Sequence, residues 1–334
     1  MPKYSFHVNR KQYHLNWDNR QPPQLTVNSG DVVTFDCIDG SNYQINLNST
    51  AKDVANLDTS IADPVFGPVY INRAEPGNAL EIEVLELEHA DWGWTAIVPG
   101  FGLLGDEFPE AHLKIWNLPT STPLTNGESK LNGHSHQRLA PFNDKIHIPI
   151  HPFMGTMGVA PSQPGAFSTI PPLDTGGNID CRHITRGTKL ILPVRTPGAL
   201  FSCGDGHAAQ GDGEVCGSAI ETPMRVTVRF KVVKSQPHVQ SPHFWSPPRR
   251  LEDEVLPDKG SYSTMGIDED ILEATRKAVR AMIEWLGVTK GLERVEAYML
   301  CSVAVDLKMS EIVDMPNFAI VATVPLNIFV DGES

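Results

Sequence analysis

The densest group of side chains that could do chemistry lies within residues 203–214, CGDGHAAQGDGE. It combines four glycines with four ionisable residues: Asp205, His207, Asp212 and Glu214. Because glycine lets the backbone turn back sharply, one loop could bring these side chains into a small volume. Carboxylates and imidazole are ligands for divalent cations, and a spare carboxylate could move the proton of a water molecule. A surface turn shaped by Asp and Gly explains the spacing equally well.

A second candidate segment is 176–183, GGNIDCRH. Its paired glycines permit a close approach of the backbone, so Asp180 could supply a metal ligand from another loop. Taken alone, the segment is better explained as a turn before the following strand. His134 and His136, two positions apart, are better explained as a solvated loop pair.

Several standard motifs are absent from the sequence. There is no C-x-x-C pair, no G-x-S-x-G nucleophile turn and no Walker A loop. A zinc ribbon, an α/β-hydrolase serine and a P-loop nucleotide site are therefore not indicated.

The elements that must position these residues are mostly strands. Short Val, Ile and Leu runs alternate with turns rich in Gly and Pro, of which there are 27 each. Strands are predicted after Gly30, Gly77 and Gly187 and over 224–233, and residues 268–286 predict an amphipathic helix ended by Gly287. The predicted fold is mainly β, with a sandwich- or barrel-like body at 1–235 and an appended α/β subdomain at 236–334.

Composition narrows the function. The formal net charge of −13 argues against binding to nucleic acid, which needs basic surfaces. No run of about 20 apolar residues predicts a membrane helix, and the first residues lack the apolar core of a secretory signal. We therefore expect a cytoplasmic protein with neither nucleic acid nor membrane as a partner.

Four blocks together resemble the acetamidase/formamidase family: GGNID at 176–180, TRGT at 185–188, GDGHAAQGDGE at 204–214 and GSAIE at 217–221. Further blocks lie elsewhere in the chain, in the same order as in the family, among them WGWT at 92–95, PGFG at 99–102 and MGTMGVAP at 154–161. The similarity covers roughly 10–330. It implies a β-rich homodimer or higher homo-oligomer that hydrolyses formamide, acetamide or a related small amide with a divalent metal, zinc or calcium.

The resulting hypothesis assigns roles within this sequence. Asp180, Asp205 and His207 hold a zinc-like ion, with Asp39 as a further ligand. Glu214 transfers the proton, and Glu214, Asp212 and His207 form the catalytic set. Asp212 and Glu221 also support the metal ligands. Trp92, Phe101 and Met154 form the substrate pocket. The alternatives are hydrolysis of another amide or a carbamate on the same fold, or an inactive homologue that only binds a small molecule.

Overall fold

The computed structural model of the chain describes residues 5–119, 139–143, 146–247, 259–294, 297, 300–301 and 304–329. Strands dominate it, which confirms the predicted mainly β fold. His134 and His136 lie outside the described residues. Within these ranges, no helix is both long enough and apolar enough to cross a membrane.

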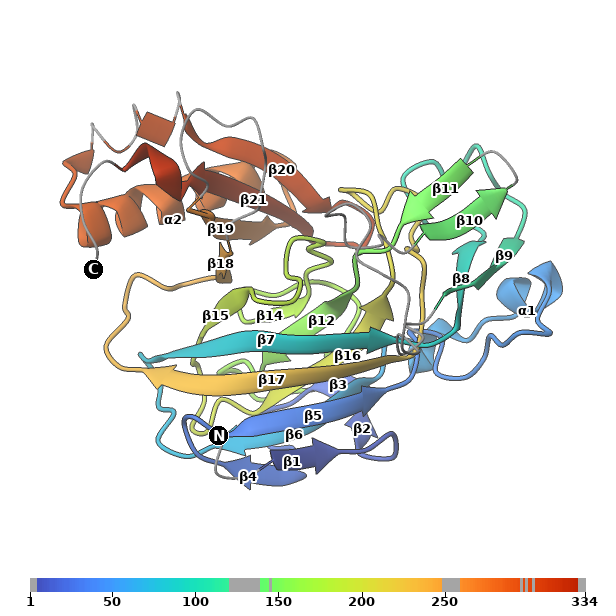
Figure 1. Cartoon of the computed structure of the whole chain (residues 1–334), viewed down its shortest axis with the longest axis horizontal. Helices are drawn as coiled ribbons and strands as arrows, with labels where there is room; N and C mark the ends of the chain where they lie inside the picture. Colours follow the sequence, from blue (N-terminus) through green and yellow to red (C-terminus); the bar gives the residue numbers. More distant parts are fainter. Residues whose placement is uncertain are drawn as a thin grey trace, which may run out of the picture.

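The larger sheet has nine strands within the described residues, in the order β1-β5-β17-β7-β15-β18-β19-β21-β20 (Figure 1). β1 and β5 pair in parallel, and the other neighbours pair antiparallel. The bounds are β1 Ser5–Val8, β5 Val32–Cys37, β17 Met224–Val233, β7 Ala79–His89, β15 Lys189–Pro193, β18 His243–Ser246, β19 Ser261–Asp268, β21 Phe318–Pro325 and β20 Asp306–Glu311.

The second sheet has the order β14-β12-β16-β6-β2, and β4 pairs with β6 beside it. Its strands are β14 Gly176–Asn178, β12 Phe153–Val159, β16 Phe201–His207, β6 Val65–Ile71, β2 Tyr13–His14 and β4 Leu25–Val27. The smaller pairs are β3 Asn16–Trp17 with β13 Phe167–Ser168, β8 Trp92–Ile97 with β9 His112–Asn117, and β10 Leu139–Asn143 with β11 Ile146–Pro149. The described helices are α1 Ala51–Ala55 and α2 Ile271–Lys290, with 3-10 turns η1 Thr59–Ile61 and η2 Leu326–Ile328.

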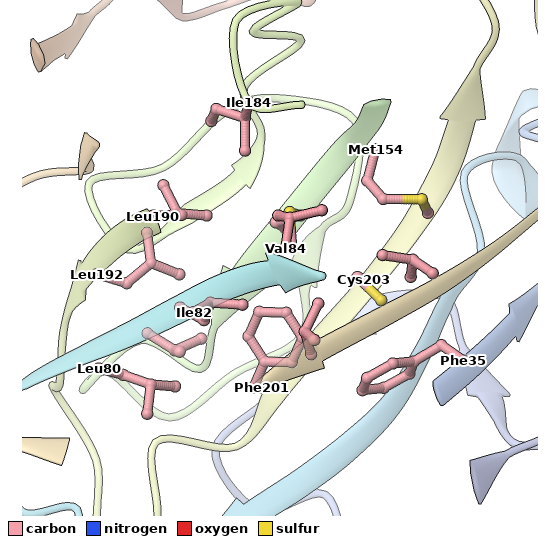
Figure 2. Packing of buried hydrophobic residues seen from close by; sticks show 14 of the residues in the cluster. Phe35, Leu80, Ile82, Val84, Met154, Ile184, Leu190, Leu192, Phe201 and Cys203 are labelled. Carbon is pink, nitrogen blue, oxygen red and sulfur yellow. The ribbon is translucent and has the colours of Figure 1, made fainter. Parts of the chain in front are cut away.

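The main core lies between the two sheets. Phe201 of the second sheet packs edge-on against Phe35 and Phe230 of the first, with ring centroids 5.8 and 5.1 Å away. Figure 2 shows Leu80 and Leu192 gathered in the same cluster. Each fully buried side chain of this size contributes about 1.5–3 kcal/mol. Every residue of β12 and β16 is buried, so polar side chains on these strands lie inside the molecule.

The predicted helix exists, but both of its predicted ends were wrong. α2 begins after Asp270, whose side chain accepts a hydrogen bond from the Glu273 N–H, and it runs through Gly287 to Lys290. Gly291, at φ 67°, ends it. Gly287 does not have a positive φ, so it continues the helix, whereas Gly291 adopts the left-handed conformation that stops one.

The nine-stranded sheet crosses the predicted boundary at residue 235. β18 pairs with β15 of the body, and β19, β21 and β20 extend the sheet from there. α2 lies against β19 and β21 at that end of the molecule (Figure 1). The division into 1–235 and 236–334 stays a prediction.

Candidate functional site

Asp205 and His207 are placed by β16. The sequence predicted a glycine-hinged loop over 203–214, but its first half is buried strand and the turn begins only after His207. The antiparallel register runs from Met154↔Gly206 to Thr156↔Gly204, so Gly155 of β12 stands opposite Asp205. This pairing of strands, and not a flexible loop, fixes the two side chains.

Three buried acidic residues of this region have a positive φ: Asp180 at 40°, Asp205 at 56° and Glu214 at 46°. Residues other than glycine seldom adopt this conformation, which costs free energy and clusters at functional sites. All three are buried. The fold therefore holds three buried carboxylates in strained positions, which favours a functional interpretation over a turn.

The two ring nitrogens of His207 have different surroundings. The Gln210 amide donates from Nε2 to the Asp180 carbonyl oxygen at 2.8 Å, so its Oε1 accepts from His207 Nδ1 at 2.8 Å. His207 Nε2 then faces Asp205 Oδ2 at 3.0 Å and Glu221 Oε2 at 3.2 Å. Nδ1 carries the hydrogen, so either a proton or a cation must lie between Nε2 and these two carboxylates.

Asp180 lies next to this group, after β14. Both of its carboxylate oxygens are buried without a hydrogen-bond partner, and Oδ1 is 3.7 Å from His207 Nδ1. A Cβ placed on Gly155 would lie 2.4 Å from Asp180 Oδ1 and 2.3 Å from Asp205 Oδ2. The space over Gly155 is therefore left to the two carboxylates, and only glycine fits there.

Three groups of described side chains have ligand atoms close enough to hold a cation, each within 4.8 Å of one another. They share members, and all six residues are buried: Asp180, Asp205 and His207; His207, Glu214 and Glu221; Asp180, Glu214 and Asp314. Buried polar atoms without partners are costly unless something binds them. The free oxygens of Asp180 and Glu221 and the Nε2 of His207 fit a divalent metal.

Burial and mutual repulsion set the charge of the site. Burial raises the pKa of Asp180, Glu214 and Asp314 well above the usual range for a carboxyl group, and neighbouring carboxylates raise it further. Burial raises the pKa of Glu221 to about 7. Burial lowers the pKa of His207, but the charges of Asp205 and Glu221 outweigh it and leave that pKa well above the usual value. The same His207 charge outweighs burial at Asp205, whose pKa is lowered.

A cavity of about 290 Å³ borders these groups, and we call it the catalytic cavity. Its lining includes five acids, Asp63, Asp205, Glu214, Glu221 and Asp314. The same lining includes the apolar side chains of Trp94, Phe101, Leu57, Val98 and Ile170. The catalytic cavity therefore offers both acidic groups and apolar surface to a small molecule.

The predicted site residues fall into two sets. Asp180, Asp205, His207 and Glu214 come together in the metal-binding groups, and Phe101 lines the catalytic cavity. Met154 is buried in the main core, and Trp92 contributes its carbonyl oxygen to a hydrogen bond from Thr222. Neither of these last two residues lines the catalytic cavity.

Asp39 and Asp212 stand apart from the groups. Asp39 is buried, but its Oδ1 accepts hydrogen bonds from Trp94 Nε1 and from Ser41, so it braces the cavity wall. Asp212 is exposed and lies 3.3 Å from His183 Nε2. Neither residue belongs to a metal-binding group of the described residues.

Sequence reasoning missed four contributors: Asp63, which lines the catalytic cavity, and Gly155, Gln210 and Asp314. Gly155 and Gln210 lie within blocks that carried the family resemblance, which was the available signal. Asp314 lies more than 90 residues after the motif and is fixed by a 2.9 Å hydrogen bond from Asn178 Nδ2. No local pattern marks it.

Comparisons with known proteins identify the family of the chain. The profile of the Acetamidase/Formamidase family matches residues 2–164 and 164–331. A formamidase of Methylophilus methylotrophus is 26% identical over 95% of this chain and 89% of its own length. An acetamidase of Mycolicibacterium smegmatis is 28% identical over 66% of each chain. The crystal structure of an acetamidase from Bacillus halodurans, 26% identical, superposes with a TM-score of 0.81 over 97% of this chain and 98% of that one. The chain therefore belongs to the Acetamidase/Formamidase family and is an amidohydrolase.

Proposed function

We propose that this amidohydrolase uses a divalent cation to convert a small primary amide, formamide or acetamide, and water into a carboxylate and ammonium. The observation that carries this proposal is the set of buried atoms without hydrogen-bond partners around His207: both oxygens of Asp180, Nε2 of His207 itself and Oε2 of Glu221. The substrates are those of the named relatives.

Asp180, Asp205, His207 and Glu221 are the proposed ligands, with Asp314 beside them. A bound divalent cation supplies Lewis acidity, which polarises a carbonyl group and makes water more acidic. The imidazole of His207 favours zinc, whereas the group of Asp180, Glu214 and Asp314 offers only oxygen atoms, which suit calcium. Zinc is our first choice and calcium the second.

Glu214 is the proposed proton carrier. It takes a proton from the attacking water and delivers one to the departing nitrogen, because an amide nitrogen leaves only when it is protonated. Burial and the neighbouring carboxylates raise the pKa of Glu214, which supports the role, because a carboxylate with a raised pKa is a stronger base. Gln210 keeps the hydrogen of His207 on Nδ1, which leaves Nε2 as a ligand.

The test is Glu214→Gln on the purified protein. We expect kcat for acetamide to fall about 10²- to 10⁴-fold, because one proton-transfer step is lost. Metal content by plasma emission should stay at the wild-type value, and exhaustive chelation of the wild type should abolish turnover. Asp212→Asn is the matched control, because Asp212 is an exposed acid on the same loop. Loss of metal from Glu214→Gln would make Glu214 a ligand, and full activity after chelation would end the metal proposal.

Two further parts of the proposal concern the setting of the enzyme. We place it in the cytoplasm and expect a homodimer or a higher homo-oligomer, which light scattering on the eluted protein measures. Hydrolysis of a carbamate or another amide, and ligand binding without turnover, are the rival functions. Ammonia release from a substrate panel separates them.

A further inference from the structure

A second and larger cavity shares the lining residue Glu214 with the catalytic cavity. Its volume is about 520 Å³, and we call it the lateral cavity. Glu214 and Ser218 line both cavities. The lateral cavity therefore also borders the proposed proton carrier, although none of the other side chains in the metal-binding groups lines it.

The walls of the lateral cavity are largely apolar. Trp116, Phe142, Ile148 and Ile220 line it, together with Ala209 and Val215. Lys114 holds the aromatic wall together, because its Nζ lies 4.6 Å from the Trp116 ring centroid and donates to the Phe142 carbonyl oxygen at 2.8 Å. The wall thus comes from β9 and β10, outside the two main sheets.

Most polar side chains beside Glu214 in this cavity already have partners. Thr95 Oγ1 accepts from Trp116 Nε1 at 2.9 Å and donates to the Ala219 carbonyl oxygen at 2.5 Å. Ser218 Oγ donates to the Ala96 carbonyl oxygen and accepts from the Ala96 N–H. Gln210 is bound at both ends of its amide. These three side chains would therefore offer a ligand few hydrogen bonds, whereas the apolar walls offer contact; the charged residues Arg182 and Asp212 also line the cavity.

The volume exceeds what acetamide needs. Four non-hydrogen atoms occupy on the order of 100 Å³, judged from about 30 Å³ for each water-sized group. Cavities of about 300–1,000 Å³ hold much larger ligands. Because Glu214 lines both cavities, a substrate whose carbonyl group lies beside Glu214 could direct its nitrogen and oxygen toward the acids of the catalytic cavity and its acyl substituent into the lateral cavity.

We propose that the lateral cavity is an acyl-binding subsite for primary amides with a bulky apolar acyl group, either an aliphatic chain of five to eight carbons or an aromatic ring. This inference rests on the proposed function and names its substrate class. The reaction is unchanged: water adds to the carbonyl carbon, the C–N bond breaks, and the nitrogen leaves with the transferred proton.

The experiment compares acetamide, butanamide, hexanamide and benzamide with the metal-loaded enzyme by ammonia release. Each buried methylene should raise kcat/KM about fourfold, so hexanamide should exceed acetamide by about 10²-fold. An equal or lower kcat/KM for hexanamide would overturn the subsite. If acetamide and formamide are not hydrolysed at all, the proposed function itself has failed, and the two failures are thus distinguishable.

Val215→Trp narrows the cavity from its exposed edge, where the Val215 side chain is 57% exposed. We expect at least a tenfold loss of kcat/KM for hexanamide and benzamide and less than a threefold change for acetamide. Leu104→Trp is the matched control, because Leu104 is a similarly exposed apolar residue that lines neither cavity. An equal loss for acetamide and hexanamide would make the cavity an access route and contradict the subsite. Thermal unfolding shows whether either variant is misfolded.

Discussion

Two buried histidines in this molecule have opposite protonation behaviour. His207 on β16 and His243 on β18 are 1% and 0% exposed. The Nε2 of His207 faces two carboxylates, and its pKa is raised well above the usual value. His243 Nδ1 lies 2.7 Å from the Tyr262 hydroxyl, and burial, with a smaller contribution from His238, lowers its pKa to about 3. Burial alone therefore does not mark a functional histidine; the charges that face it do.

The surroundings of His243 explain its structural role. Tyr262 also stacks on Trp285 of α2, with ring centroids 3.9 Å apart, so the hydrogen bond joins the sheet to the helix cluster. None of the described acids forms an ion pair with His243. A neutral imidazole that packs and makes one hydrogen bond is sufficient there. The His207 region instead gathers more acids than the imidazole can neutralise, which is what a cation site requires.

The largest expected effect comes from Gly155→Ala. The new Cβ would lie closer than 2.5 Å to carboxylate oxygens of both Asp180 and Asp205, so these side chains must move. We expect activity and metal affinity to fall by about 10²-fold or more, because an error of about 1 Å in a catalytic group has an effect of that size. Enzyme assays and metal titration measure the two losses.

Gly211→Ala is the control, because a Cβ there meets nothing within 4 Å. A Gly155→Ala protein that folds normally and binds metal as tightly as the wild type would show that the His207 region is not the metal site. The different surroundings of His207 and His243 would then not reflect metal binding at His207.

The second prediction concerns the pH dependence of stability. The pKa of His243 is about 3 in the folded protein and about 6.5 when unfolded, so the unfolded chain binds more protons between these values. The contribution of His243 to the free energy of unfolding should therefore fall as pH drops below about 6.5, by up to about 1.4 kcal/mol per pH unit.

Urea unfolding at pH 7, 6 and 5 measures this contribution as the difference between wild type and His243→Phe. The variant should lose stability less steeply on acidification, while the kcat/KM for acetamide at pH 7 stays within twofold. If the free energies of unfolding of the two proteins fall equally with pH, His243 is accessible to water and the prediction is wrong. A loss of turnover in His243→Phe would show that His243 contributes to catalysis.

The smallest expected effect is that of Asp314→Asn. The substitution keeps the shape of the side chain but removes one charge from the group with Asp180 and Glu214. We expect about a tenfold loss of metal affinity, the lower end of the range for residues that support a metal site. Isothermal titration of the metal-free protein gives the value. Unchanged metal affinity would mean that the cation binds at His207 and not in the group with Asp314.

Much of the architecture was readable in the sequence. The alternation of Val226, Val228 and Phe230 with polar residues predicted β17 with its observed bounds, because period-two burial is a local signature of a strand. The motif at 203–214 named three members of the site, Asp205, His207 and Glu214. Its backbone form was not predicted, because whether a glycine-rich segment is a loop or a strand depends on β12 beside it.

The rest needed tertiary structure. Asp180, Glu221 and Asp314 reach His207 from separate parts of the chain, and their approach depends on sheet register and on the Asn178–Asp314 hydrogen bond. A sequence specifies which side chains can ionise, since that is a property of each residue. Whether water is excluded from them, and which charges face one another, is decided only when distant strands pack together. This packing gives His207 and His243 their different charge environments.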